Sequence, residues 1–451
     1  MSEFDVRGKR VTVAGAARSG IAASELLVKR GARVTLSETR PEVNEADRLR
    51  KLGVQLELGG HQTETFNDAD LIVTSPGVQP DQPIIAGARA RGVPVIGEME
   101  LASRWLRGRI VAITGTKGKS TTTELSGRIL EAAGFKVTVG GNIGAALSAQ
   151  VEESTPDTVH VVEASSFQLE QIETFHPWIA VMLNFSPDHL DRHPTIAAYG
   201  AAKARVFENQ KAGDWKVINA DDPAVLDLAR SGRAQTRFFA MRTPIDAGTA
   251  IEAGWIVDRA KAKTTKLVPL DAVHLLGPHL VNDVMAAATV GAIVGAAPAA
   301  MTAAVDSFEG LEHAMELVAE IGGVRFVNDS KATNVDAALH SIESFDTGLV
   351  PIIGGRFKGG DLRLLREPLE KRARAVVAIG EAAPLVKAAL AGAVDVREPK
   401  TFEDAVKEAY ALAKPDGVVL LAPACSSFDM FSHYAERGRR FKEEVRKLKG
   451  V

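Results

Sequence analysis

A glycine-rich run between a strand-like and a helix-like segment constrains this chain more than any other feature. The run reads Gly115-Thr116-Lys117-Gly118-Lys119-Ser120-Thr121; it follows the apolar stretch Ile110–Ile113 and precedes a helix-like stretch from Thr121 to Glu131. The backbone N–H groups of such a loop close around phosphate oxygens, and the helix N-terminus adds a partial positive charge. Lys119 would reach the terminal phosphates, and the Ser120 hydroxyl would ligate magnesium. The run therefore predicts an ATP site, with a glycine-rich turn at a helix start as the alternative.

The bulk properties are those of an ordinary globular chain. Its 451 residues correspond to about three domains at the usual domain size. The formal net charge of -3 provides no basic field for nucleic acid. Residues Met1–Asp5 lack the basic start and apolar core of a signal peptide, and no apolar run is long enough to span a bilayer. The single cysteine, Cys425, excludes an internal disulfide and a cysteine-rich metal site. We therefore expect a cytoplasmic enzyme without membrane insertion or a nucleic-acid partner. A monomer is expected as well, although these properties do not bear on it.

The first hundred residues alternate between strand-like and helix-like segments. Strands are expected at Arg10–Val13, Arg33–Leu36, Leu71–Thr74 and Val93–Ile96, with a helix at Ile21–Lys29. The loop 15–20 is a degraded dinucleotide fingerprint, because Ala17 stands at its middle glycine, and Glu38 lies at a distance that suits a ribose hydroxyl. This leaves three interpretations open: NAD, another nucleotide, or a structural turn. Ser75-Pro76-Gly77 is a turn at the carboxyl end of a strand, where open α/β sheets bind ligands.

The rest of the chain reads as two further α/β blocks. Strands are expected at Val137–Val139, Val159–Glu163, Ile179–Leu183 and Val217–Ile218 in the second block, and at Val324–Val327, Leu349–Ile353, Ala375–Ile379 and Val418–Leu421 in the third. The less regular stretch 249–276 is expected to carry antiparallel strands, and the alanine-rich helix 282–294 to close at Ala297-Pro298. The last helix, from about Asp429 to Lys449, carries many charges and is expected to be largely solvated. The fold class is α/β with three domains, at 1–107, 108–310 and 311–451.

Chemistry-bearing side chains gather where strands of the second block end. Glu163 ends an apolar strand in the block of the phosphate loop, which is a common place for a magnesium ligand; a solvated strand terminus is the alternative. The run from Asn184 to His193 concentrates Asp, His and Arg, although its two histidines can also be ordinary loop residues. Lys203 lies on a helix, and a helical lysine taken alone is usually solvated.

Three polar loops follow strands of the third block. They are Asn328–Asn334, Gly354–Gly360 and Pro423–Asp429. The first of them is expected to be a binding loop, because it offers a cation, an anion, hydroxyls and amides together; the alternative is that Asp329 or Ser330 caps the next helix, which needs only one such residue. Because all three loops fall at carboxyl ends of strands in one sheet, they indicate a site for a small anionic ligand.

Taken in this order, the motifs resemble the Mur ligase family over essentially the whole chain. The marks are Gly115–Thr121, Gly141–Gly144, Glu163–Glu170, Asp188–Arg192, Asn328–Asn334 and Pro423–Asp429. The resemblance implies a Rossmann-like N-terminal domain, a central P-loop ATPase-like domain and a Rossmann-like C-terminal domain. It implies an ATP-dependent ligase of peptidoglycan precursor synthesis. The short first domain and the run Asp329–Asn334 are similar to the branch that adds D-glutamate to UDP-N-acetylmuramoyl-L-alanine through an acyl phosphate.

The resemblance also implies a role for each matching residue. The first domain would bind the UDP sugar rather than NAD, and the matching positions are Arg18, Ser19, Glu38, Thr39, Arg40, Ser75, Pro76, Gly77, Asn142 and Ser165. ATP would be bound by Gly115, Thr116, Lys117, Gly118, Lys119, Ser120, Thr121, Asn282 and Asp329. D-Glutamate would be bound by Thr333, Lys358, Ser427 and Tyr434, and catalysis would use Lys119, His189, Lys203 and Lys331. Two magnesium ions would be held by Ser120, Glu163, His189 and Lys203, the last as a carbamate formed with carbon dioxide.

Two departures from the family pattern leave alternatives open. The family has Gly-x-His-Asn-x-x-Asn before its alanine-rich helix, whereas Leu280 and Asp283 stand at the two asparagines here and Asn282 sits one residue early. The family has His-Arg near the start of the third domain, whereas His313 is followed here by Ala314, which cannot neutralise phosphate charge. The alternatives are a Mur-type ligase for another amino acid, a degenerate nucleotide-binding homologue, and an NAD-dependent oxidoreductase.

Overall fold

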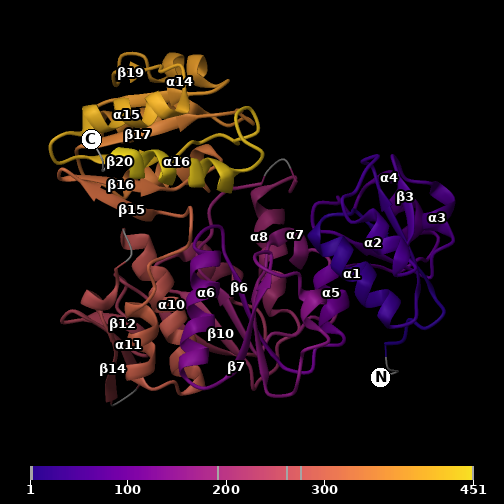
Figure 1. Ribbon diagram of the computed structural model, residues 1–451. Helices are drawn as coiled ribbons and strands as arrows, with labels where there is room; N and C mark the ends of the chain where they lie inside the picture. Colours follow the sequence, from indigo (N-terminus) through magenta and orange to yellow (C-terminus); the bar gives the residue numbers. More distant parts are fainter. Residues whose placement is uncertain (1–3, 190–191, 261–262, 275–276, 449–451) are drawn as a thin grey trace. The chain divides into compact units, whose positions relative to one another are not determined.

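The computed structural model describes residues 4–189, 192–260, 263–274 and 277–448 (Figure 1). The chain divides into two compact units, one formed by residues 1–273 and 281–307, the other by 274–280 and 308–451. The first unit contains two sheets and the second contains one. No helix within the described residues is long and apolar enough to cross a membrane.

The first sheet consists of five parallel strands in the order β3-β2-β1-β4-β5. Its strands are β1 Arg10–Ala14, β2 Arg33–Glu38, β3 Gln55–Leu58, β4 Leu71–Thr74 and β5 Val95–Gly97. Its helices are α1 Arg18–Lys29, α2 Ala46–Lys51, α3 Thr63–Asn67, α4 Pro83–Ala90 and α5 Glu98–Ser103. The alternation of strand and helix predicted for this segment is confirmed, although β3 was not predicted and β5 begins two residues later than expected.

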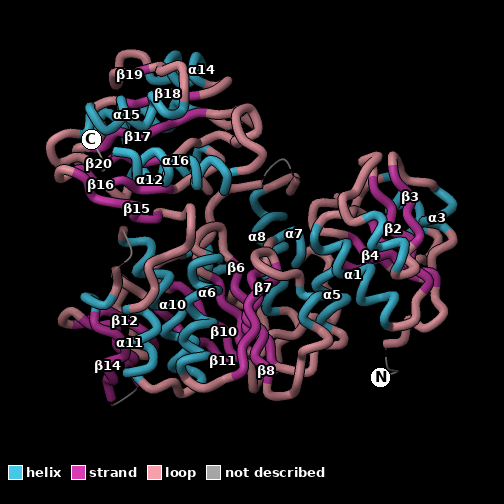
Figure 2. Tube along the Cα trace, viewed as in Figure 1, coloured by secondary structure: helices cyan, strands magenta, loops and turns pink. Residues whose placement is uncertain are grey.

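The second sheet has nine strands in the order β14-β13-β12-β11-β10-β9-β6-β8-β7. Strands of this sheet, among them β6, β7 and β8, are drawn in magenta in Figure 2. The strands are β6 Arg109–Thr114, β7 Lys136–Gly141, β8 Thr158–Glu163, β9 Ile179–Met182, β10 Trp215–Asn219, β11 Gln235–Phe239, β12 Gly248–Glu252, β13 Trp255–Ala260 and β14 Lys263–Pro269. All neighbouring pairs among strands β6 to β12 are parallel. The pairs β12–β13 and β13–β14 are antiparallel, as expected for the less regular stretch 249–276. The central strand β6 is buried from Ile110 onward, and the phosphate loop begins where it ends.

Six helices within the described residues accompany this sheet. They are α6 Lys119–Ala132, α7 Ser166–Leu169, α8 Ile196–Ala204, α9 Pro223–Leu228, α10 Pro278–Val294 and α11 Pro298–Asp306, with 3-10 turns at Leu147–Gln150, Arg205–Phe207 and Leu270–Ala272. The predicted end of the alanine-rich helix at Val294 is confirmed, but Ala297-Pro298 does not close it. Helix α10 ends at Val294 and is followed by Gly295 at a positive φ of 77°, whereas Pro298 occupies the first turn of α11. Proline suits that position because the first helical N–H groups need no intrahelical acceptor.

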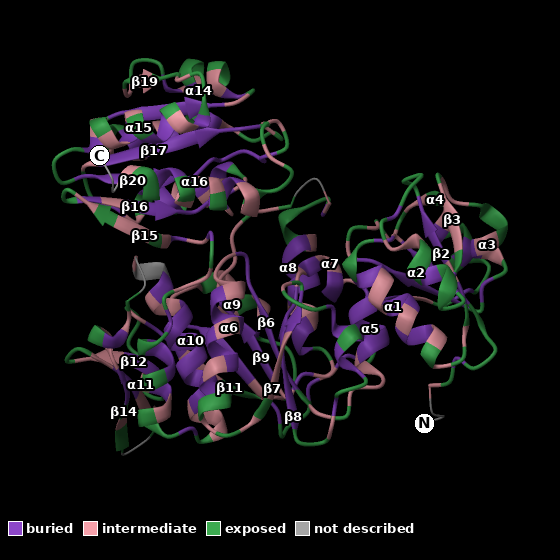
Figure 3. Cartoon of the chain, viewed as in Figure 1, coloured by how far each residue is buried: buried purple, intermediate pink, exposed green. Residues whose placement is uncertain are grey.

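The third sheet has six strands in the order β15-β16-β20-β17-β18-β19. The strands are β15 Glu316–Ile321, β16 Val324–Asn328, β17 Leu349–Gly354, β18 Val376–Ile379, β19 Val396–Arg397 and β20 Val418–Leu421. The helices are α12 Val335–Glu343, α13 Arg366–Arg372, α14 Ala383–Leu390, α15 Phe402–Ala413 and α16 Tyr434–Leu448, with a 3-10 turn at Leu362–Leu365. Strand β20 pairs in parallel with β16 on one side and with β17 on the other, and Figure 3 shows these strands buried. The three polar loops therefore leave three adjacent strands at the same edge, as predicted.

The last helix differs from its prediction in both position and burial. Helix α16 begins at Tyr434 rather than near Asp429, and Arg437, Gly438, Phe441 and Val445 are buried. Phe441 and Val445 lie four residues apart, so they face the same side and pack against the core of the third sheet. Because the other faces of this helix carry many charges, the sequence did not indicate that one face is buried.

Candidate active site

The phosphate loop has the strand–loop–helix geometry that its sequence predicts. Strand β6 ends at Thr114, the loop follows, and α6 begins at Lys119. Gly118 has a φ of 79°, a backbone conformation that disfavours any residue with a side chain. A Cβ atom added there would also lie 2.1 Å from Asp283 Oδ1. Glycine is therefore required at 118 by both conformation and space.

Asn184, directly after β9, fixes the backbone of this loop. Its side-chain Oδ1 accepts hydrogen bonds from Thr116 N at 3.1 Å and Lys117 N at 2.9 Å, and its Nδ2 donates to Lys117 O at 3.1 Å. Thr116 Oγ1 accepts a hydrogen bond from the Tyr199 hydroxyl at 3.3 Å. Tyr199 lies on α8, so the helix that carries Lys203 also supports the phosphate loop.

Two lysines converge on the carbonyl oxygens of the loop. Lys119 Nζ donates to Gly115 O at 3.0 Å and to Thr116 O at 2.8 Å. Lys203 Nζ donates to Gly115 O at 2.6 Å and lies 4.6 Å from the centre of the Tyr199 ring. Lys203 is only 1% exposed, so the expectation that a helical lysine is solvated is wrong here. Burial, with the nearby charge of Lys119, lowers the pKa of Lys203 well below its usual value, although Asp188 and Glu163 oppose the shift.

Glu163 lies at the end of β8 and is buried rather than solvated. Its Oε1 accepts a hydrogen bond from Asn142 Nδ2 at 2.7 Å. Among the described residues, nothing donates a hydrogen bond to its other oxygen, Oε2, which is buried. A buried carboxylate oxygen without a donor is a suitable ligand for a hard divalent cation, so Glu163 fits the magnesium that the sequence predicts.

His189 lies on the loop after β9 in a left-handed backbone conformation, with a φ of 54°. Non-glycine residues adopt this conformation rarely, and often at functional sites. Its ring is 5.0 Å from the Phe167 ring and 6.0 Å from the Tyr199 ring. Leu190 and Asp191, which belong to the same motif, lie outside the described residues. No group of three His, Cys, Asp or Glu side chains suited to a metal is found in the described part of the chain.

The two family departures on α10 have different structural consequences. Asp283 is buried against the phosphate loop, whereas Leu280 is buried in the hydrophobic core of the second unit. Asn282 is half-buried, and its Oδ1 has no hydrogen-bond partner among the described residues. Asp283 therefore lies at the phosphate loop. The sequence analysis noted only that it replaces an asparagine of the family pattern and did not predict this contact.

The predicted UDP-sugar residues of the first sheet form a network around Glu38. The Glu38 carboxylate accepts hydrogen bonds from Ala16 N at 2.7 Å, Arg40 Nη2 at 3.0 Å and Thr39 Oγ1 at 3.1 Å. Although burial opposes it, Arg40 and the backbone N–H groups lower the pKa of Glu38 to about 2. The carboxylate is therefore ionised at neutral pH and fixes the loop that ends at Gly20, as a nucleotide-binding turn requires.

The other predicted UDP-sugar residues lie at both sheets of the first unit. Arg18 begins α1 and donates to Asn142 O at 3.0 Å, and Ser19 is buried in the first turn of the same helix. Ser75 Oγ donates to Gly15 O at 2.9 Å, and Pro76 and the exposed Gly77 continue that turn. Ser165 is the N-cap of α7, where it and Gln168 form a capping box. Its hydroxyl thus has a structural role that the sequence analysis did not consider.

In the second unit, the predicted ATP and D-glutamate residues follow β16, β17 and β20. Asp329 accepts hydrogen bonds from Met315 N at 3.2 Å and from Ser341 Oγ. The backbone N of Lys331 donates to His313 O at 3.0 Å, and Lys358 Nζ lies 5.2 Å from the centre of the Phe428 ring. Ser427 is buried, while Tyr434 is 40% exposed at the start of α16.

Thr333 precedes Asn334, whose Oδ1 accepts a hydrogen bond from Ala337 N at 2.8 Å. Asn334 is therefore the cap of α12, which excludes the alternative that Asp329 or Ser330 caps this helix.

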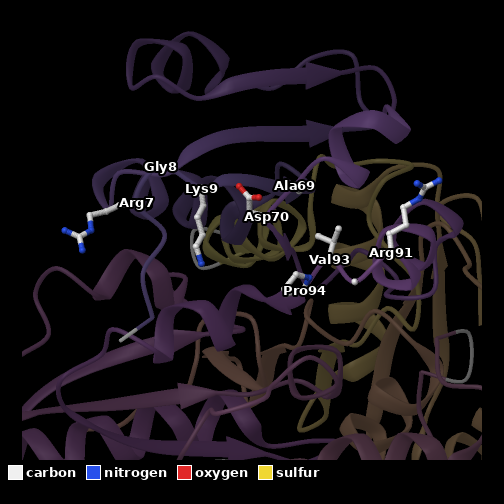
Figure 4. A pocket seen from close by; sticks show the side chains of 9 residues that line it. Arg7, Gly8, Lys9, Ala69, Asp70, Arg91, Val93 and Pro94 are labelled. Atoms are coloured by element: carbon white, nitrogen blue, oxygen red, sulfur yellow. The ribbon is translucent and has the colours of Figure 1, made fainter. Parts of the chain in front are cut away.

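One surface hollow of about 640 Å³ lies outside this set of residues. It is lined by Arg7, Gly8, Lys9, Ala69, Asp70, Arg91, Gly92, Val93 and Pro94. These residues precede β1, β4 and β5, so the hollow lies at the amino ends of the strands, opposite the edge where the predicted ligand residues gather. Figure 4 shows that Arg7 and Arg91 point away from each other, so their cations do not converge on one ligand.

The comparisons with known proteins agree with this geometry. A phosphate loop supported by oxygen ligands suited to magnesium is typical of enzymes that act on nucleoside triphosphates. Family models match the three sheets in turn: the MurD-like N-terminal domain of Mur ligases over residues 9–97, the Mur ligase middle domain over 113–291, and the Mur ligase glutamate ligase domain over 313–425. The chain belongs to the Mur ligase family, whose members are ATP-dependent ligases.

Curated relatives match over nearly their whole length. The UDP-N-acetylmuramoylalanine--D-glutamate ligase of Koribacter versatilis is 45% identical over 448 residues, which covers 99% of both chains. The enzyme of the same name from Pelotomaculum thermopropionicum is 42% identical over 450 residues, again covering 99% of both. Among solved structures, the MurF ligase of Thermotoga maritima has a TM-score of 0.61 at 18% identity, covering 98% of this chain and 96% of that one. The UDP-N-acetylmuramate-alanine ligase MurC of the same organism has a TM-score of 0.60 at 19% identity, covering 98% and 100%. These structures share the predicted fold.

Proposed function

We propose that this chain joins D-glutamate to UDP-N-acetylmuramoyl-L-alanine with hydrolysis of ATP, in cytoplasmic peptidoglycan precursor synthesis. The observation that carries the proposal is the surroundings of the phosphate loop. Lys203 is hydrogen-bonded to Gly115 O of this loop, and Glu163, at the end of neighbouring β8, has a buried carboxylate oxygen without a donor among the described residues. Relatives at 40–45% identity that bear the name of this activity support it.

The three sheets suggest a division of the substrates. Residues 1–107 would bind the UDP sugar through the network of Glu38, Arg18 and Ser75. Residues 108–310 would bind ATP, and residues 311–451 would bind D-glutamate through the loops after β16, β17 and β20. The enzyme would act as a monomer.

The chemistry begins with activation of a carboxylate, because its oxygen is a poor leaving group. The terminal alanine carboxylate attacks the γ-phosphorus of ATP, the bond from that phosphorus to the bridging oxygen breaks, and an acyl phosphate and ADP form. Lys119 and the amides of the phosphate loop stabilise charge on the transferring group. Ser120 and Glu163 would hold one magnesium ion and His189 a second, and a carbamate on Lys203 would help to hold magnesium. When bound, these ions supply charge neutralisation at the phosphates.

The amine of D-glutamate then attacks the acyl carbon, and inorganic phosphate leaves. This amine must lose a proton to become nucleophilic. His189, on the exposed loop after β9, and the departing phosphate are the two candidate bases. Thr333, Lys358, Ser427 and Tyr434 would orient the amino acid.

Lys203 would become a metal ligand only after carbamylation. A neutral amine attacks carbon dioxide and then loses a proton, and the product is an anion able to hold magnesium. The burial that lowers the pKa of Lys203 favours the neutral amine that this reaction needs. We expect a carbamate carbon signal when the enzyme is incubated with ¹³C-labelled bicarbonate, and no such signal from Lys203→Ala. An equal signal from both proteins would refute the assignment.

The first test is phosphate release from ATP and magnesium with UDP-N-acetylmuramoyl-L-alanine. D-Glutamate, L-glutamate and L-lysine are compared as amino acids. We expect release only when the UDP sugar and D-glutamate are both present. Release with a different amino acid would indicate another Mur-type ligase, and ATP binding without release would indicate a degenerate homologue.

A further inference from the structure

Arg437 on α16 forms hydrogen bonds to the polar loops that follow β16 and β20 and lies close to the loop that follows β17. Its Nε donates to Ser330 Oγ at 3.0 Å, and its Nη2 donates to Ser330 O at 3.0 Å, both in the first loop. Nη1 and Nη2 each donate to Cys425 O at 3.2 Å, in the loop after β20. The loop after β17 approaches so closely that a Cβ atom on Gly355 would lie 3.2 Å from Nη1.

The charge of Arg437 is buried without a direct counter-ion. The residue is 0% exposed, and no carboxylate of the described residues lies within ion-pair distance of its guanidinium. Burial lowers the pKa of Arg437 to about 10, although Cys425 and Asp429 oppose the shift, so the guanidinium stays protonated at neutral pH. Burying an unpaired charge is costly, and such charges are normally paired or placed at functional sites.

The positions of these contacts connect Arg437 to the predicted amino-acid site. Ser330 lies between Asp329 and Lys331 in the chain, and Cys425 lies two residues before Ser427. Ser330 Oγ also donates to Tyr434 O at 2.7 Å, which joins the start of α16 to the same loop. One side chain thus bonds to the backbone one residue before Lys331 and two residues before Ser427, and no carboxylate of the described residues forms an ion pair with it.

We propose that Arg437 is a positioning residue that sets these three loops for an acidic amino acid, and that its buried charge, which forms no direct ion pair with the described residues, favours binding of that anion. This inference rests on the proposed function. The carboxylates of the substrate would bind near the buried positive charge of Arg437 without touching that side chain. An amino acid of the same length with a neutral side chain lacks the second carboxylate and would gain less from this charge.

The test compares Arg437→Met with wild type in steady-state assays that vary one substrate at a time. We expect the KM for D-glutamate to rise about tenfold or more, the size expected when a charged group in a buried site is lost. The KM values for ATP and for the UDP sugar should stay within about twofold. Single-turnover ADP formation without D-glutamate should also persist, because Arg437 does not contact the phosphate loop. Arg437→Lys keeps the charge and should raise the KM for D-glutamate less.

Arg440→Met is the matched control, because Arg440 lies on the same helix and is partly exposed in an ion pair with Glu403. It should leave all three KM values unchanged. If Arg437→Met does not fold, Ser330→Ala removes the acceptor of Arg437 Nε and should raise the KM for D-glutamate selectively. An unchanged KM for D-glutamate, or an equal rise in all three KM values, would overturn the inference while wild type remains active. A wild type without D-glutamate-dependent phosphate release would overturn the proposed function, and this inference with it.

Discussion

At the scale of single residues, Asp283 is a carboxyl group enclosed beside a loop suited to phosphate. It is 3% exposed, and its Oδ1 lies against Gly118. Burial raises the pKa of Asp283 well above its usual 3.8, and Thr122 and Lys119 oppose the shift only in part. An acid with a raised pKa in the folded state is protonated there and ionised in the unfolded chain above pH 3.8. Its contribution to stability therefore becomes less favourable as the pH rises through that value.

We expect Asp283→Asn to stabilise the fold at neutral pH, because the amide carries no charge to desolvate. The gain should be about 1 kcal/mol, a usual size for one substitution, and should vanish as the pH falls to about 4. Urea unfolding midpoints across this pH range measure it. Asp227→Asn is the control, since Asp227 is 66% exposed and paired with the exposed Arg230. A variant that is less stable than wild type at pH 7 would show that Asp283 folds as a carboxylate.

Single residues also show where sequence reasoning stopped. The roles of Gly118 and Lys119 could be predicted because one contiguous motif contains them. The burial of Lys203 could not be predicted, because one of the residues that enclose it, Gly115, belongs to a loop that is distant in the chain, while Tyr199 lies on its own helix. Arg437 was missed for the same reason: its acceptors lie at Ser330 and Cys425, and its own helix reads as charged.

At the scale of elements, buried parallel strands were predicted better than edge strands. Strands such as β8 and β17 are buried along their whole length and therefore read as continuous apolar runs. Strands β3, β15 and β19 lie at sheet edges and are at most partly buried, so their sequences are mixed and they were not predicted. Strand β11, between β10 and β12, begins with exposed polar residues and was missed as well.

Helix α16 owes its close packing to Gly438. A Cβ atom there would lie 2.3 Å from His313 Nδ1, and that nitrogen is 2.9 Å from Asn328 Nδ2. We expect Gly438→Ala to destabilise the protein by about 1–2 kcal/mol, because overpacking costs more than the helix propensity that alanine adds. Gly87→Ala on α4 is the matched control, since nothing lies within 4 Å of its added Cβ. That control should be neutral or slightly stabilising in thermal unfolding. A stabilised Gly438→Ala would mean that His313 moves aside freely.

At the scale of the whole molecule, the order of the motifs predicted more than any one motif did. The loop at 15–20 alone left NAD open, and its combination with the phosphate loop and the three later loops favoured a ligase. The structure shows, in addition, which contacts connect the first and second sheets of the first unit. Glu100 on α5, after the first sheet, accepts hydrogen bonds from Glu173 N, Thr174 N and Phe175 N at 2.8, 2.9 and 2.9 Å. These three residues lie between α7 and β9 of the second sheet, so one carboxylate connects the two.

Removing that carboxylate should therefore weaken the first unit. Burial opposes ionisation of Glu100, but Thr174, the backbone N–H groups and Arg104 outweigh it and lower its pKa below 4.5. The carboxylate thus stabilises the fold above pH 4.5, and this contribution is lost as the pH falls through the lowered pKa. We expect Glu100→Gln to cost about 3 kcal/mol at pH 7, as when one partner of a buried ionic network is removed, with a smaller difference from wild type below about pH 4. Glu152→Gln is the control: Glu152 also bridges the two sheets' regions through Arg30, but it is 49% exposed and should cost about 0.5 kcal/mol or less. Urea unfolding at several pH values measures both, and equal losses in the two variants would mean that Glu100 contributes no more than a surface ion pair.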